Sequence, residues 1–346
     1  VAAGLLVRDG HEVIGLSMQL YDHSVRSESA QQQGEIRFGS CCTLSDLYDA
    51  RRVAHTLGIT HYIVNFERRF EEHVVSNFVS EYASGRTPIP CVHCNGDLKF
   101  ASLVDRADGF GAQAVATGHY ARVEFNEETR RYRLLRGLDR QKDQSYFLFT
   151  LTQAQLARAR FPIGALDKAA VREEARRLGL GVADKPDSQE ICFVAAGEHA
   201  DFVATRASIG GGEIRDRGGR VLGRHGGIQH FTIGQRKGLG LAAGIPLYVV
   251  EIDAASAVVT VGPREALDRV ALTVSRANWI SGEPPTSAMR AEVRIRYRHR
   301  EAAATIHPIG GNTAHIVFDT PQAAIAPGQA AVFFDGDVVL GGGWID

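Results

Sequence analysis

Apolar runs of strand length alternate with helix-like stretches along the first half of the chain, and this alternation constrains the fold more than any other feature. The runs typical of buried strands are residues 11–20, 60–66 and 114–118. The stretches with helical spacing of apolar residues are 45–58, 70–82 and 100–108. Such alternation favours an α/β layer with a largely parallel sheet.

The carboxyl ends of the predicted strands carry residues that we expect to face one crevice. In open parallel sheets, ligands bind beyond these strand ends. Met18 and Gly118 stand at or near two such ends, and the stretch 85–100 follows the second predicted helix. We therefore expect these three features to share a ligand site.

The pattern changes at about residue 198. Glycine becomes frequent, helical spacing disappears, and Gly218-Gly219 marks the turn of a hairpin over 213–222. Short alternating strands, typical of a β-barrel, are then expected at 291–298, 313–318, 330–334 and 338–340. We expect three domains: an α/β domain (1–198), a small β-rich domain (199–265) and a C-terminal β-barrel (266–346).

Composition indicates a cytoplasmic globular protein. Hydrophobic residues make up 44% of the 346 residues and charged residues 23%, which are ordinary values. No run approaches the roughly 18 apolar residues of a membrane-spanning helix, and no signal peptide is evident. Five cysteines are too few for a disulfide scaffold and suit cytosolic chemistry. A net charge of −1 means that any nucleic-acid surface must be a local patch.

The stretch 85–100 combines a stiff approach with two cysteines. Pro88 and Pro90 fix φ twice within three residues, so we expect an extended, rigid loop that holds the Cys91-x-x-Cys94 pair. Asn95 is placed to cap a following helix, whose dipole would favour a thiolate near its N-terminus. The same spacing also fits half of a zinc site, and spacing alone leaves both interpretations open.

The other cysteines lie far away in sequence. Cys192 follows the polar run Lys185-Pro-Asp-Ser-Gln-Glu190, so we expect it at the exposed end of an apolar strand, with a buried inert thiol as the alternative. Only the fold can bring Cys192 to Cys94. Cys41 and Cys42 cannot easily bind one metal together and are expected to pack in the interior.

Residues 290–300 form the most basic run. Alternate side chains of a strand share a face, which would carry Arg290, Glu292, Arg294, Arg296, Arg298 and Arg300. With Tyr297 available for stacking, this face favours a nucleic-acid backbone as partner, and a solvated charged strand is the alternative.

Three further segments are candidates for the same partner. They are the glycine-punctuated basic loop 231–240, the polar loop Lys142-Asp143-Gln144-Ser145, and His119, which follows Gly118 at a strand end and could touch a phosphate. Plain turns or structural side chains are the alternatives.

Motifs along the whole chain resemble the tRNA-specific 2-thiouridylase (MnmA) family of PP-loop ATP pyrophosphatases. They are Gly85-Arg-Thr-Pro, Cys94-Asn, Thr117-Gly-His-Tyr120, Leu134-Leu-Arg-Gly-Leu-Asp139, Lys142-Asp-Gln-Ser-Tyr-Phe147, Asp187-Ser with Ile191-Cys-Phe193, Gly234-Gln-Arg-Lys-Gly-Leu-Gly240, Arg296-Tyr-Arg298 and Pro327-Gly-Gln329. The resemblance implies an adenine-nucleotide alpha-hydrolase (PP-loop) domain, a small central domain that binds tRNA, and a C-terminal β-barrel.

The resemblance also implies an enzyme, a tRNA-uridine 2-sulfurtransferase. It would use ATP, with Mg²⁺, to replace the C2 oxygen of the wobble uridine (position 34) of glutamate, glutamine and lysine tRNAs by sulfur. The sulfur would come from a donor fed by a cysteine desulfurase.

The resemblance assigns roles to residues of this sequence. Cys94 becomes the nucleophile and Cys192 the persulfide carrier, and the two would form a disulfide at the end of the transfer. Met18 and Gly118 would contact ATP, and Ile89, Pro90 and Cys91 would face the target base. The residues expected to contact tRNA are His119, Lys142, Asp143, Gln144, Arg296, Tyr297 and Gln329.

The sequence departs from the family pattern at two places. The first residues are typical of the end of a helix, and the family's Ser-Gly-Gly-Val-Asp-Ser-Ser phosphate loop is expected immediately before Val1; without it, we expect the chain as written to bind ATP poorly and not to thiolate. Ile89 replaces the usual asparagine, and Cys91 cannot act as a carboxylate. Two alternatives stay open: the same reaction with an iron–sulfur cluster on Cys91, Cys94 and Cys192, and a non-catalytic tRNA-binding relative.

Overall fold

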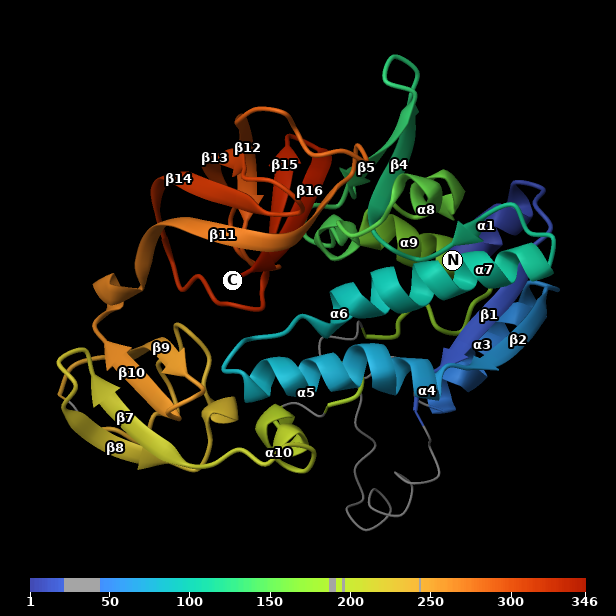
Figure 1. The fold of residues 1–346 in the computed structure, drawn as a ribbon. Coiled ribbons are helices and arrows are strands. Elements are labelled where there is room, and N and C mark those ends of the chain that lie inside the picture. The colour runs from blue at the N-terminus through green and yellow to red at the C-terminus, as the bar shows by residue number, and fades with distance from the viewer. Residues whose placement is uncertain (22–43, 187–190, 195–196, 243) are drawn as a thin grey trace, which may run out of the picture. The chain divides into compact units, whose positions relative to one another are not determined.

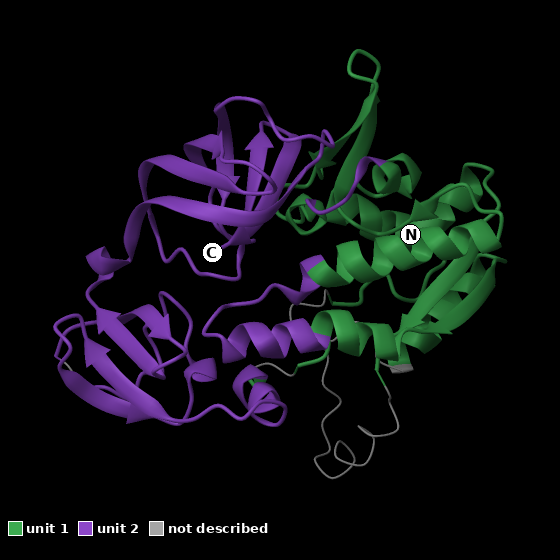
Figure 2. Cartoon of the chain, viewed as in Figure 1, with its two compact units in different colours: residues 1–74, 93–148, 154–198 green, residues 75–92, 149–153, 199–346 purple. Residues whose placement is uncertain are grey.

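The computed structural model describes residues 1–21, 44–186, 191–194, 197–242 and 244–346 (Figure 1). Cys41 and Cys42, which we expected to pack in the interior, lie outside the described residues. The chain divides into two compact units (Figure 2). Unit 1 comprises residues 1–74, 93–148 and 154–198, and unit 2 comprises residues 75–92, 149–153 and 199–346.

Unit 1 contains the predicted α/β layer. Strand β1 (Ile14–Gln19) runs parallel to β2 (Thr60–Asn65), and helix α3 (Leu44–Thr56) packs on both strands. A second parallel pair joins β3 (Val115–Ala116) to β6 (Ala159–Arg160). Parallel pairing with helices between the strands confirms the predicted fold class.

The first 198 residues contain further helical elements, among them the predicted helices over 70–82 and 100–108, and two of the elements described are π-helical. They are α1 (Ala2–Arg8), α4 (Glu67–Phe70), the π-helical η1 (Glu71–Val75), α5 (Ser76–Ala83), α6 (Pro90–His93), the π-helical η2 (Cys94–Phe100), α7 (Ala101–Gly109), the 3-10 turn η3 (Ser145–Leu148), α8 (Gln153–Arg158) and α9 (Lys168–Arg177). Helix α9 shows why they form: the Asp167 side chain accepts a hydrogen bond from the Ala170 N–H at 2.7 Å, and Val171 and Ala175 form a buried stripe.

A hairpin, β4 (Ala121–Asn126) and β5 (Arg131–Arg136), follows β3. Only its second strand is evident from the sequence, because β4 carries polar residues at most of its half-exposed positions. The hairpin leads into the loop that contains Lys142.

The central part of unit 2 is a small sheet. A short helix, α10 (His199–Ala204), comes first, although we expected helical structure to end by residue 198; buried Ala200 and Val203, three residues apart, hold it. The sheet order is β8 (Val221–His225), β7 (Gly212–Asp216), β10 (Val258–Gly262) and β9 (Tyr248–Asp253). The predicted hairpin is confirmed by the antiparallel β7–β8 pair and by Gly219 at a φ of +86°. Short turns η4 (Ile228–His230) and η5 (Arg264–Leu267) complete this region.

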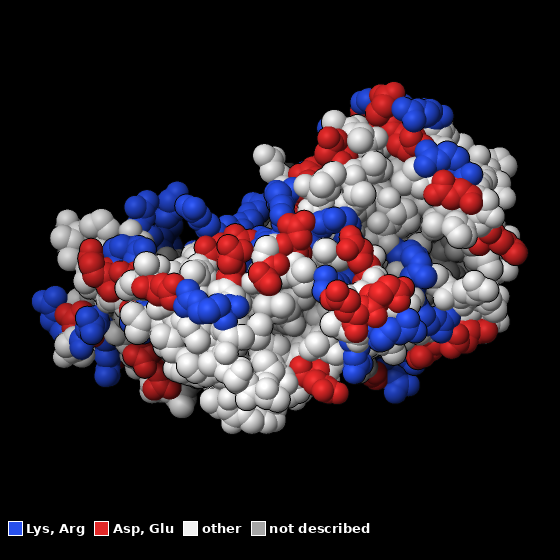
Figure 3. Space-filling model, turned by 90° about the horizontal axis from the view of Figure 1, so that it is seen from above, with Lys and Arg blue, Asp and Glu red and all other residues white. Residues whose placement is uncertain are grey.

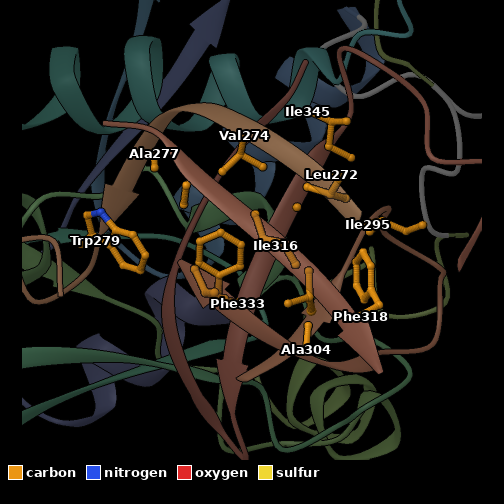
Figure 4. Packing of buried hydrophobic residues seen from close by; sticks show 14 residues of the cluster. Leu272, Val274, Ala277, Trp279, Ile295, Ala304, Ile316, Phe318, Phe333 and Ile345 are labelled. Carbon is orange, nitrogen blue, oxygen red and sulfur yellow. The ribbon is translucent and has the colours of Figure 1, made fainter. Parts of the chain in front are cut away.

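The C-terminal part of unit 2 is the predicted β-barrel. Its strands are β11 (Asp268–Trp279), β12 (Met289–Arg294), β13 (Ala302–Pro308), β14 (Ala314–Ala323), β15 (Ala330–Asp335) and β16 (Val338–Ile345). They pair in the order β11-β14-β13-β12-β15-β16, and a β11–β16 pair closes the barrel. Alternate residues point inward, so Val274, Ile316 and Phe333 lie in one fully buried core (Figure 4).

Candidate functional site

The two cysteines of the stretch 85–100 lie on a helix, so the predicted extended cysteine loop is wrong. Residues 86–89 are non-helical, but α6 begins at Pro90. Proline suits the first helical position because the N–H that it lacks would have no helical partner there. Cys91 is exposed and Cys94, one turn later, is buried.

The helix becomes π-helical at Cys94. Such turns occur frequently at functional sites. Asn95, the predicted cap, lies inside this stretch with 4% exposure, and its Oδ1 accepts a hydrogen bond from Lys99 Nζ at 3.1 Å. Leu98 and Phe100 are fully buried and fix the stretch to the core. Cys94 is therefore held on a well-packed element.

Cys192 lies on a turn over residues 191–194, so the predicted strand is wrong. It is half-buried, and the Tyr21 hydroxyl donates to its carbonyl oxygen at 3.5 Å. The next residue, Phe193, is buried and packs edge-on against Phe70 of α4, with 5.3 Å between ring centroids. Helix α4 also contacts η2, so the segments of Cys94 and Cys192 pack on the same helix. The implied disulfide is not formed: both residues are thiols in this structure.

Met18 and Gly118 occupy the strand ends expected of them. Met18 is buried one residue before the end of β1 and pairs with Val64 of β2. Gly118 follows β3 and is exposed; a Cβ there would meet only Ile163 Cδ1, at 3.9 Å. The backbone at Gly118 is thus open to a ligand, at the edge where α/β folds bind ligands.

His119 is held by its surroundings as a neutral side chain. Its Nδ1 lies 2.7 Å from Thr117 Oγ1, and its ring packs 6.4 Å from that of Phe100 and 6.0 Å from that of Phe161. Burial, and secondarily the charge of Lys99, lowers the pKa of His119 to about 3. His119 can therefore offer a phosphate a hydrogen bond but no charge at neutral pH. Lys99 was missed from the sequence, although its i+4 spacing from Asn95 was a usable signal.

The loop that contains Lys142 is held by its own side chains. Asp143, 2% exposed, accepts hydrogen bonds from the backbone of Gly137 (3.0 Å) and Ser145 (3.1 Å) and from the Ser145 hydroxyl (3.0 Å). Gln144 Oε1 accepts from the Tyr120 N–H at 3.0 Å. Asp143 has almost no surface for an RNA contact, whereas Lys142 is half-exposed.

The single arginine face predicted over residues 290–300 is wrong. Strand β12 ends at Arg294, and residues 295–299 form a bend and a turn. Arg290 is paired with Asp319, and Arg294 is paired with Glu301. Arg290 is exposed but paired, and beyond the strand Arg296, Arg298 and Arg300 are exposed, with Tyr297 half-buried among them. Basic and acidic side chains are likewise interspersed on the face shown in Figure 3.

Gln329, expected to contact RNA, is half-buried and bonded to the protein itself. Its Nε2 donates to the Thr87 carbonyl oxygen at 3.0 Å. Thr87 stands two residues before Ile89 and three before Pro90, both of which are buried. The barrel turn therefore touches the segment that leads to Cys91.

The basic loop 231–240 borders a hollow. The hollow has a volume of about 550 Å³ and is lined by Arg236, Gly238, Leu239, Gly240, Leu241, Ala242, Ile245, Pro246 and Leu247. Gln235 fixes the loop, because its Oε1 accepts from the Thr232 N–H at 2.9 Å and its Nε2 donates to the Lys237 carbonyl at 3.1 Å. Arg236 and Lys237 are exposed on this rigid loop.

The described part of the chain contains no set of side chains arranged to bind a metal ion. Within it, no three His, Cys, Asp or Glu side chains are grouped so as to hold a metal ion. Cys91, Cys94 and Cys192 are all described, so neither the iron–sulfur alternative nor the zinc interpretation gains support from the geometry. Among the described residues no helix is both long and apolar enough to cross a membrane.

Comparisons with known proteins cover essentially the whole chain. Residues 1–196 match the model of the tRNA methyl transferase HUP domain, residues 200–263 that of the tRNA methyl transferase PRC-barrel domain, and residues 269–345 that of the aminomethyltransferase beta-barrel domain. A tRNA-specific 2-thiouridylase MnmA from Solibacter usitatus is 50% identical over 100% of this chain and 95% of its own length. The MnmA of Geotalea uraniireducens is 50% identical (100% and 91%), and that of Koribacter versatilis is 48% identical (99% and 94%).

Proposed function

Because this chain belongs to the tRNA-specific 2-thiouridylase family, we propose that it is an ATP-dependent enzyme that replaces the C2 oxygen of the wobble uridine of tRNA by sulfur. The observation that carries the proposal is the placement of Cys94 and Cys192, far apart in sequence, on segments that pack against the same helix, α4. The matching family models are named for methyl transfer, but a pair of thiols suits sulfur transfer.

ATP would supply the adenylyl group that turns the C2 oxygen into a leaving group. In this chain Met18 and Gly118 would hold it: Gly118 offers open backbone and Met18 an apolar wall at the ends of parallel strands. We place Mg²⁺ with the nucleotide. The chemistry that remains belongs to the two cysteines.

Sulfur transfer proceeds through two bond exchanges. The terminal sulfur of a persulfide on Cys192 attacks C2, and the C2–O bond breaks. The base is then joined to the protein as C2–S–S–Cys192. The Cys94 thiolate attacks Sγ of Cys192, which releases the thiolated base and leaves a Cys94–Cys192 disulfide. An external thiol reduces this disulfide and restarts the cycle.

The two cysteines have settings that match these roles. The carrier must meet an external sulfur donor, and Cys192 is half-exposed on a turn. The resolving thiol must attack one defined sulfur, and Cys94 is buried on a packed helix. The segment of Ile89, Pro90 and Cys91, which precedes Cys94 in the chain, would face the target base through exposed Cys91, with Ile89 and Pro90 buried behind it.

We assign the tRNA contacts from the exposed surface of each expected residue and from the hydrogen bonds that it already makes within the protein. Lys142, Arg296 and Tyr297 have exposed surface for the phosphates and bases of the tRNA. His119 would give a neutral hydrogen bond. Asp143 and Gln144 would act by shaping the loop that presents Lys142. Arg236 and Lys237 would add two exposed basic side chains from the loop 231–240.

The wider setting is proposed from the same family. The substrates would be the glutamate, glutamine and lysine tRNAs, the sulfur donor one fed by a cysteine desulfurase, and the location the cytoplasm, where tRNA and ATP are available. The three-domain division at residues 198 and 265 is supported by the ranges of the family models.

Cysteine variants of the full-length protein, expressed with the family's phosphate loop before Val1, test the proposal. In a single turnover without added thiol, Cys94→Ser and Cys192→Ser should each lower the release of tRNA that contains 2-thiouridine by at least about 10³-fold, while tRNA-dependent release of pyrophosphate from ATP still occurs. Cys91→Ser is the comparison variant: Cys91 would face the base but takes part in neither bond exchange, so thiolation should fall by far less than in the other two variants. Loss in all three variants together with protein-bound iron would indicate the cluster mechanism instead, and tRNA binding without any thiolation by the unaltered protein would indicate a non-catalytic relative.

A further inference from the structure

The segment between α5 and α6 is fixed to the C-terminal barrel, and we propose that the barrel turn 326–329 is a clamp that positions residues 89–91 for the reaction, with Gln329 as its positioning residue. Both parts belong to unit 2 (Figure 2). The inference rests on the role proposed above for residues 89–91. It gives Gln329 a different task from the direct tRNA contact expected from the sequence.

The clamp begins where helix α5 ends. Gly85, at a φ of +70°, closes the helix: its N–H donates to the Tyr82 carbonyl, and the Arg86 N–H donates to the Glu81 carbonyl at 2.9 Å. The Arg86 side chain then turns back, with Nε donating to Glu81 Oε2 at 2.7 Å and Nη2 to the Ile345 carbonyl at 3.3 Å. Arg86 is therefore held by both α5 and the last barrel strand.

Thr87 is held on both sides of its peptide. Its N–H donates to the Pro327 carbonyl at 2.8 Å, and its carbonyl accepts from Gln329 Nε2 at 3.0 Å. The turn itself is tied to β16, because the Gly328 N–H donates to the Ile345 carbonyl (2.9 Å) and the Ile345 N–H to the Gln329 carbonyl (2.8 Å). The segment thus pairs with the barrel like a short added strand.

Gly328 allows this close approach. It has a φ of +85°, and a Cβ there would lie 2.8 Å from Glu81 Oε2, 3.0 Å from the Thr87 nitrogen and 3.1 Å from Arg86 Cβ. Any side chain would push the segment away from the turn. The motifs Gly85-Arg-Thr-Pro and Pro327-Gly-Gln, which are far apart in the sequence, are therefore two halves of one contact.

The position of Thr87 determines that of residues 89–91, because the backbone between them is stiff. Pro88 and Pro90 fix φ at two of the three positions between Thr87 and Cys91. Ile89 and Pro90 are buried, so the segment has little freedom to adjust. A shift at Thr87 would therefore displace the start of α6, and small misplacements of reacting groups are costly to rate.

The test separates positioning from binding in the full-length protein. Gln329→Met keeps the length of the side chain and removes the donor to Thr87. We expect the single-turnover rate of thiolation at saturating tRNA to fall roughly tenfold, the Kd for tRNA to stay within about twofold, and amide hydrogen exchange in residues 85–91 to accelerate. Gly328→Ala should lower the rate further, by roughly a hundredfold.

Gly310→Ala is the matched control. Gly310 also has a positive φ, +99°, in a barrel turn, but a Cβ there meets nothing within 4 Å. It should carry the same backbone strain and leave both rate and Kd unchanged. Thermal unfolding identifies any variant that fails to fold, in which case Gln329→Met alone decides.

Two results would overturn the clamp. One is a Gln329→Met protein that binds tRNA more weakly but thiolates at the normal rate when saturated, which would make Gln329 a tRNA contact. The other is unchanged hydrogen exchange in residues 85–91. Absence of thiolation by the unaltered protein would instead refute the proposed function, and the exchange measurement would still decide the clamp.

Discussion

Strand β12 and the turn that follows it share the most basic run of the chain, yet they use their arginines differently. In the strand, Arg290 and Arg294 are bonded to Asp319 and Glu301. On the turn, Arg296 and its neighbours are exposed. The difference comes from acidic partners that lie outside the run, one of them on β14. A basic run therefore predicts a phosphate-binding surface only for those of its arginines that are not paired with carboxylates elsewhere in the fold.

The largest effect expected from this comparison is on stability. Arg294→Ala should lower the free energy of unfolding by about 2 kcal/mol, because Glu301 would lose its partner in a site where both side chains are mostly buried. The guanidinium also lies over the Phe334 ring, 5.2 Å from its centroid. Denaturant unfolding measures the loss, and the tRNA affinity of the folded variant should be normal. A stable variant with weakened tRNA binding would place Arg294 with the turn arginines.

His119, in unit 1, is another side chain that is bonded within the protein, like Arg290 and Arg294. Its pKa is lowered to about 3 from an ordinary value of 6.5, so the unfolded chain binds more protons between these values and stability falls as pH decreases below 6.5. Between pH 7 and pH 5.5 we expect the unaltered protein to lose about 1 kcal/mol through this group. Unfolding curves of His119→Asn at the two pH values should lack this loss. Equal losses in both proteins would show that His119 is not held neutral.

Arg296→Ala should weaken tRNA binding and leave stability unchanged, the reverse of what we expect for Arg294→Ala. We expect no change in unfolding free energy, a Kd for tRNA raised roughly three- to tenfold, and a salt dependence of binding reduced by about one phosphate contact. Binding titrations at several salt concentrations measure both quantities. Unchanged affinity and salt slope would remove Arg296 from the tRNA surface.

Arg290→Ala should give the smallest effect and serves as the control for both arginine variants. The pair with Asp319 is exposed, and exposed ion pairs contribute little to stability. Its guanidinium is already occupied by a carboxylate, so tRNA binding should also change little. A loss of affinity as large as that of Arg296→Ala would restore the single arginine face predicted from the sequence.

The parts of the fold that could be predicted are those in which local pattern decides. Alternating apolar residues located most barrel strands, and Gly219 located the β7–β8 turn. Helix α9 has a cap and a stripe that can be read directly. These patterns involve residues close together in the sequence, so the elements can be predicted without knowing their tertiary contacts.

The errors arose where distant residues or competing local signals decide. Two prolines before Cys91 suggested an extended loop, but Pro90 also suits a first helical position, and burial of Leu98 and Phe100 favours the helix. The strand expected at Cys192 is a turn because burial of Phe193 against Phe70 dominates there. The roles of Gln144 and Gln329 depend on backbone groups of Tyr120 and Thr87, which no sequence pattern reveals.

The most direct test of the account is to trap the sulfur on its carrier. Full-length Cys94→Ser protein, given tRNA, ATP and a persulfide donor, should accumulate a covalent protein–tRNA adduct through Cys192, because the resolving thiol is missing. Mass spectrometry would locate the disulfide at Cys192, and added thiol should release tRNA that contains 2-thiouridine. Cys192→Ser protein should form no adduct. An adduct on another cysteine, or full turnover by Cys94→Ser protein without any adduct, would contradict the account.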